Sequence, residues 1–64
     1  MQYVVLVMEN VDAWNCETER YDWGENKTDA VKHAQLIAEY RQKDGRHCNV
    51  FVHENGCLML DLSV

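Results

Sequence analysis

The chain has 64 residues, of which 47% are hydrophobic, and its eleven acidic side chains against six basic ones give a formal net charge of −5. This length allows one domain, residues 1–64, with one small core, and the apolar fraction excludes a disordered tail. No apolar run approaches the roughly twenty residues that a membrane helix needs. The acidic balance argues against direct binding to nucleic acid, because neutralising phosphates requires clustered Lys and Arg.

The charge is unevenly distributed along the chain. Residues 1–29 contain seven acids and two bases, which gives −5, whereas residues 30–64 contain four of each. The N-terminal Met1–Tyr3 lacks the basic region of a signal peptide, so we expect a cytoplasmic protein. The three cysteines follow no CxxC or zinc-ribbon spacing, which predicts free thiols in a reducing compartment.

The first half of the chain predicts two strands. Tyr3–Met8 is a continuous apolar and β-branched run, typical of a central strand that is buried on both faces. Turn-forming residues follow at Asn10–Asp12. The stretch around Cys16–Tyr21 then returns as an antiparallel strand, and its alternating charges suit the edge of a sheet, where charge discourages aggregation.

A helix is predicted after Gly24. Thr28 suits the N-cap, Asp29 complements the positive end of the helix dipole, and Gly45 provides the stop. At 100° per residue, five apolar side chains share one face of this helix. They are Ala30, Val31, Ala34, Ile37 and Ala38, and their small alanines would allow close packing against a sheet.

Residues 47–54 and 57–62 predict a β-hairpin around Asn55-Gly56, the dipeptide that best suits a two-residue type I′ turn. That register pairs Val52 with Met59, and it gives the hairpin a leucine-rich face and a valine-rich face. The element order is therefore β-β-α-β-β. This order predicts an α+β two-layer sandwich, in which one helix covers an antiparallel sheet of about four strands.

One helix covers about one face of a small sheet, yet both faces of the first strand and of the hairpin are apolar. If the leucine-rich face meets the helix, the uncovered patch contains Val50, Val52 and Met59, a candidate dimer or second interface. Either Trp14 and Trp23 fold over this patch, or another chain covers it. The marginal stability of so short a domain favours another chain.

Histidines and cysteines are numerous enough to hold a metal, but their spacing matches no known metal-binding loop. In the predicted register Cys48 and Cys57 lie about six residues apart along the hairpin, roughly 20 Å, too far for a shared zinc or a disulfide. Cys48 follows His47 directly, so their side chains point to opposite faces and the thiol lacks a neighbouring base. We therefore expect no metal, no cofactor and no enzymatic activity.

The segment 9–29 interleaves acidic and aromatic side chains. Trp and Tyr dominate the binding energy of many interfaces, and surrounding charge guides the encounter. The alternative is that the tryptophans cover the core and that the acids form a solvated face. As an interface, the segment predicts a protein partner with a basic surface and a partner-binding site of Trp14, Glu17, Glu19, Tyr21, Asp22, Trp23 and Glu25.

The layout of elements resembles that of small acidic phage proteins, namely some anti-CRISPR proteins and short inhibitors of bacterial RNA polymerase. The segments that carry the resemblance are YVVLVM, ETERYDW, TDAVKHAQLIAEY and NVFVHENGCLML. It implies inhibition by binding, without catalysis. The expected function is to mask a nucleic-acid-handling surface of a host protein, with carboxylates in place of phosphates. A structural or regulatory homodimer is the alternative.

Overall fold

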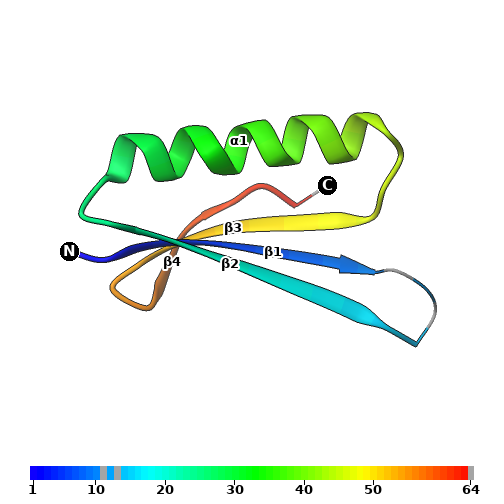
Figure 1. The fold of residues 1–64 in the computed structure, drawn as a ribbon, viewed down its shortest axis with the longest axis horizontal. Coiled ribbons are helices and arrows are strands. Elements are labelled where there is room, and N and C mark those ends of the chain that lie inside the picture. The colour runs from blue at the N-terminus through cyan, green and yellow to red at the C-terminus, as the bar shows by residue number, and fades with distance from the viewer. Residues whose placement is uncertain (11, 13, 64) are drawn as a thin grey trace.

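A computed structural model describes residues 1–10, 12 and 14–63, and in this part of the chain one helix covers a four-stranded antiparallel sheet (Figure 1). The sheet order is β2-β1-β3-β4, which places β1 in the centre and β2 at an edge, as the sequence predicts. The predicted α+β fold and the order β-β-α-β-β are therefore confirmed. The elements are β1 (Tyr3–Asn10), β2 (Cys16–Gly24), α1 (Lys27–Lys43), β3 (Cys48–Glu54) and β4 (Cys57–Asp61).

Turns were predicted at Asn10–Asp12 and at Asn55-Gly56, and only the second lies wholly within the described residues. Asn55 and Gly56 both have positive φ, at 50° and 81°, as a type I′ turn requires, so the predicted hairpin between β3 and β4 is confirmed. The turn predicted at Asn10–Asp12 includes Val11, which lies outside the described residues.

The predicted register of the β3–β4 hairpin is wrong beyond its first two residue pairs. His53 pairs with Leu58 as expected, but Val52 then pairs with Leu60, because a bulge inserts Met59 as an extra residue. Both Met59 and Leu60 are half-buried and pack against the core. The backbone N–H of Leu62 then donates to the carbonyl of Val50, so the chain after β4 continues along β3.

Helix α1 begins slightly earlier than the sequence predicts. Its N-cap is Asn26, not Thr28, and the Asn26 side chain makes no hydrogen bond to a backbone N–H of the first turn. Asn26 Nδ2 instead donates to Asp29 Oδ2 over 2.7 Å. The predicted stop is confirmed, because Gly45 has φ +74° and its N–H donates to the carbonyl of Gln42 over 3.0 Å.

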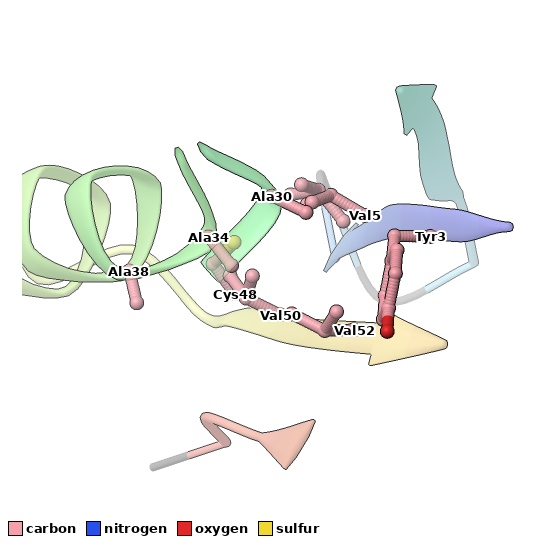
Figure 2. Close-up of a cluster of buried hydrophobic side chains, with 9 residues drawn as sticks. Tyr3, Val5, Ala30, Ala34, Ala38, Cys48, Val50 and Val52 are labelled. Atoms are coloured by element: carbon pink, nitrogen blue, oxygen red, sulfur yellow. The ribbon is translucent and has the colours of Figure 1, made fainter. Parts of the chain in front are cut away.

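The core lies between α1 and the two central strands. Figure 2 shows the helix alanines directed toward the valines of β1 and β3. Small side chains on the helix allow its axis to lie close to the sheet, and the β-branched valines then fill the interface without large gaps. The buried apolar residues are Tyr3, Val5, Val7, Ala30, Ala34, Ala38, Cys48, Val50 and Val52.

The face of the sheet that meets the helix is not the one that leucine content suggests. Val50 and Val52 are completely buried beneath α1, and Met59 is half-buried, so the interface predicted from these three residues is wrong. No other described element covers the opposite side of the sheet, which we call the open face (Figure 1). The apolar residues of this face are Val4, Leu6, Met8, Phe51 and Leu58, and His53 lies on the same face.

Candidate interaction surfaces

The tip of the β1–β2 hairpin presents Trp14 to solvent, with 92% of this residue exposed. The carboxylate of Asp12 accepts hydrogen bonds from Trp14 and Asn15. Asp12 Oδ1 accepts from the backbone N–H groups of Trp14 and Asn15, over 2.8 and 3.0 Å, and Oδ2 accepts from Asn15 Nδ2 over 2.8 Å. These bonds, the Asn15 amide first, hold the pKa of Asp12 below its ordinary value. The carboxylate therefore stays ionised, and able to accept these bonds, to a lower pH than an ordinary aspartate.

Two aromatic residues of the predicted binding site face the helix instead of solvent. Tyr21 and His33 pack edge to face with 4.7 Å between their ring centroids, and Trp23 packs on the same imidazole at 5.2 Å. Trp23 Nε1 also donates to His33 Nδ1 over 3.0 Å. Both residues of β2 are half-buried against the core. The position of Trp23 agrees with the alternative that the tryptophans cover the core, whereas the exposed Trp14 does not.

Glu19 belongs to an ionic cluster at the end of the sheet that lies near Gly45. The backbone places Glu9 in phase with the buried valines of β1, and only 8% of it is exposed. Arg46 donates to Glu9 through both Nε and Nη2, the latter over 2.6 Å to Oε2. Arg41 Nη1 lies 3.5 Å from Glu9 Oε2 and 2.6 Å from Glu19 Oε2. The hydrogen bond from Arg41 lowers the pKa of Glu19.

Sequence reasoning missed this cluster because its members are far apart in the chain. One signal was present, since Glu9 follows Val5 and Val7 at the two-residue spacing of side chains that share a strand face. A carboxylate at an inward position of a central strand needs a cationic partner, because an unpaired buried charge is costly. The two arginines that supply it, Arg41 and Arg46, flank the end of α1.

The remaining acids of the predicted binding site do not form one continuous surface. Glu17 is exposed on β2 close to the hairpin tip. Asp22 lies on the open face and forms an ion pair with Arg20 over 3.2 Å. Glu25 follows β2, and its carboxylate lies 3.8 Å from the N-terminal amine. The structure thus separates Trp14 and Glu17, at one end of β2, from Asp22 and Glu25 at the other.

The three cysteines lie in different environments, and none of them belongs to a group that could hold a metal ion among the described residues. All three cysteines are free thiols, with Cys16 and Cys57 exposed and Cys48 buried. Burial raises the pKa of the Cys48 thiol, although Arg41 acts in the opposite direction. A thiol with a raised pKa is a poor nucleophile. Among the described residues, no group of three or more His, Cys, Asp and Glu side chains is arranged to hold a metal ion.

The chain matches no protein family, no characterised protein and no solved structure with which it was compared. Within residues 1–10, 12 and 14–63, no helix is long and apolar enough to cross a membrane. Two exposed surfaces combine apolar side chains with nearby charge, the hairpin tip with Trp14 and the open face of the sheet.

Proposed function

We propose that this protein acts by binding another protein, without catalysis, and that the tip of the β1–β2 hairpin enters the contact. The partner that its charge suits is a basic surface, of the kind a host protein uses to hold nucleic acid. A phage or mobile-element inhibitor of this kind would act in the host cytoplasm by occupying that surface. The observation that carries the proposal is Trp14, which is almost fully exposed and whose backbone N–H donates to Asp12.

An exposed indole on a backbone that is hydrogen-bonded to a neighbouring carboxylate is well suited to binding. Burying a tryptophan removes about 200 Å² from water, which makes it the side chain that contributes most to many interfaces. The hydrogen bonds that Asp12 accepts from Trp14 and Asn15 hold these two residues to its carboxylate before the partner arrives. Less conformational entropy is then lost on binding, so more of the burial energy appears as affinity.

The charge of the chain supports a basic partner. The formal net charge is −5, and Glu17 is exposed close to the hairpin tip. Carboxylates near the contact raise the rate of encounter with a positive surface and oppose approach to nucleic acid itself. Glu19 contributes little to this effect, because Arg41 neutralises it within the molecule.

Binding to an isolated partner tests the proposal. The tagged protein is used to capture its target from a bacterial lysate, and the affinity for the purified target is then measured for wild type and Trp14→Ala. We expect Trp14→Ala to weaken binding by at least about 30-fold, which corresponds to a loss of about 2 kcal/mol, the threshold of an interface hot spot. Tyr40→Ala is the matched control, since Tyr40 is an exposed aromatic residue on α1.

The contribution of charge to binding is tested separately, through the rate of association. Glu17→Lys should slow association with the purified target, and the difference from wild type should shrink as salt is raised. The wild-type protein should also displace a DNA or RNA oligonucleotide from that target. Equal affinities of Trp14→Ala and Tyr40→Ala, or a target that keeps its nucleic acid when the protein is bound, would contradict the proposal.

A further inference from the structure

We infer that the open face is the surface on which a second copy of this chain binds, giving a two-fold symmetric dimer in which two sheets pack face to face. This inference goes beyond the proposed function and rests on different residues. The hairpin tip with Trp14 lies in the turn at the end of β1 and is not part of the face.

The open face is apolar in its centre and lacks a cover within the described chain. Leu58 is 57% exposed and Met8 is 40% exposed, while Val4, Leu6 and Phe51 are only half-buried by their neighbours on the sheet. A hollow of about 420 Å³ opens beside Val4 and Leu6. Apolar side chains grouped in this way on a small domain indicate an interface.

The register of the sheet makes this face complementary to itself. Leu6 pairs with Arg20 on one side and with Phe51 on the other, and Phe51 pairs with Asp61. One row across the four strands therefore reads Arg20, Leu6, Phe51, Asp61, with a cation at one edge, an anion at the other and two apolar side chains between them.

A two-fold axis that lies in the interface, parallel to the strands and between β1 and β3, reverses this row in the second copy. Arg20 of each copy then faces Asp61 of the other, and Leu6 faces Phe51. Each dimer gains two such ion pairs, because a contact across a two-fold axis occurs twice. Aligned packing of two sheets, with the strands within about 30° of each other, is a common way to bury their faces.

The net charge of −5 does not oppose this contact, because most acids lie elsewhere. Glu9, Glu17 and Glu19 pair in register with residues of β1 or β2 that point to the helix side of the sheet. The open face itself carries Arg20, Asp22 and Asp61 as its charged residues among those described, so its own formal charge is −1. It is therefore the surface where two copies meet with little repulsion.

The size of the face sets the expected affinity. Eight residues of β1 extend about 26 Å and four strands span about 19 Å, so each copy offers roughly 500 Å² and the pair about 1,000 Å². This area is at the low end for specific complexes. We therefore expect a dimer that dissociates in the micromolar range, with monomer and dimer both present at accessible concentrations.

Reversing the charge at either end of this row, at Arg20 or at Asp61, tests the inference. Arg20→Glu places like charges against Asp61 of the second copy at both contacts, and Asp61→Lys does the same against Arg20. Sedimentation equilibrium should show that each variant alone has at least about tenfold weaker self-association than wild type. An equimolar mixture of the two variants should regain the dimer, because both contacts of the mixed pair are then between opposite charges.

Controls separate this contact from effects on the fold or on total charge. Lys32→Glu and Glu39→Lys make the same changes of charge on the exposed side of α1, and they should leave self-association unchanged. Circular dichroism checks that every variant is folded. Leu58→Asp provides a second route, because it places a carboxylate in the contact without touching the buried core, and it should abolish the dimer.

Three results would overturn the inference. They are a wild-type protein that stays monomeric up to near-millimolar concentration, a dimer that Arg20→Glu and Leu58→Asp leave intact, and a mixture of the two charge variants that fails to associate. A wild-type chain that stays monomeric and binds an unrelated protein on its open face is a case of the first result. Trp14→Ala should leave the dimer unchanged, so failure here is distinguishable from failure of the proposed function.

Discussion

The two faces of the four-stranded sheet are built from similar apolar residues but have different environments. On the covered face, Val5 and Val50 are completely buried beneath the helix alanines. On the open face, Val4 and Leu6 alternate with Val5 along β1 and remain partly exposed. On the covered face the β-branched side chains lie opposite alanines, and this combination allows the helix to approach the sheet closely.

This difference also separates two roles within one small sheet. The covered face supplies the packing that holds the chain folded, and its ends are fixed by Trp23 at β2 and by the pairing of Glu9 with Arg46. The open face supplies area that contributes little to the isolated fold but is available for association. Substitutions on the covered face should therefore change the free energy of unfolding, and those on the open face should change self-association.

The largest effect is expected for a matched pair of valines. Val50→Ala removes two methyl groups from a completely buried side chain, and the free energy of unfolding should fall by about 2–3 kcal/mol. Val4→Ala makes the same change on the open face and should cost less than about 1 kcal/mol. Urea denaturation at low-micromolar protein concentration measures both, and equal losses would show that the two faces are equally buried.

The two tryptophans sharpen the comparison at the level of single side chains. Trp23→Ala removes the ring that packs on His33 and donates to it, so the free energy of unfolding should fall by about 2 kcal/mol. Trp14→Ala should change it by less than about 0.5 kcal/mol, because the turn uses only the backbone N–H of Trp14. A destabilised Trp14→Ala variant would mean that this ring packs against the fold.

The smallest effects are expected for two ion pairs, Glu19 with Arg41 on the covered face and Asp22 with Arg20 on the open face. The pKa of Glu19 is held below its ordinary value of 4.5, chiefly by the hydrogen bond from Arg41. A carboxylate with a lowered pKa stabilises the fold above its unfolded-state pKa, and this contribution is lost as the pH falls through the folded-state pKa. Glu19→Gln should therefore cost up to about 1 kcal/mol at pH 7 and less at pH 3.

Asp22→Asn is the matched change in an ion pair on the open face, and it is compared with Glu19→Gln at pH 7. It removes the exposed pair between Asp22 and Arg20, which should contribute less than about 0.5 kcal/mol. Thermal denaturation from pH 3 to pH 7 should show a pH-dependent difference from wild type for Glu19→Gln, and at pH 7 this difference should exceed that of Asp22→Asn. The reverse order would place the stabilising charge on the open face.

The features of the fold that were predictable from the sequence have local causes. The Asn55-Gly56 turn needs only two residues that tolerate positive φ, and Gly45 ends the helix by the same property. The apolar spacing of Ala30, Ala34 and Ala38 identifies the buried face of α1 without knowledge of the rest of the chain. Such signals were sufficient for the order of the elements.

The features that were predicted wrongly depend on contacts between distant residues. The bulge at Met59 shifts the pairing so that Val52 meets Leu60, and nothing in the hairpin sequence marks it. The choice of the valine-rich face for the core depends on how the helix alanines fit the sheet. Of the seven residues predicted to bind a partner, Trp14 is strongly exposed, whereas Tyr21 and Trp23 turn inward to a histidine on α1.

The ends of β1 have a practical consequence for experiments on immobilised protein. The backbone of Gln2 exchanges two hydrogen bonds of 2.8 Å with Asn55, which fixes the start of the chain against the β3–β4 turn. Trp14 lies beyond the other end of the same strand, about 26 Å away. A molecule attached to a support through its amino terminus would therefore direct the indole outward and keep the sheet accessible from the side.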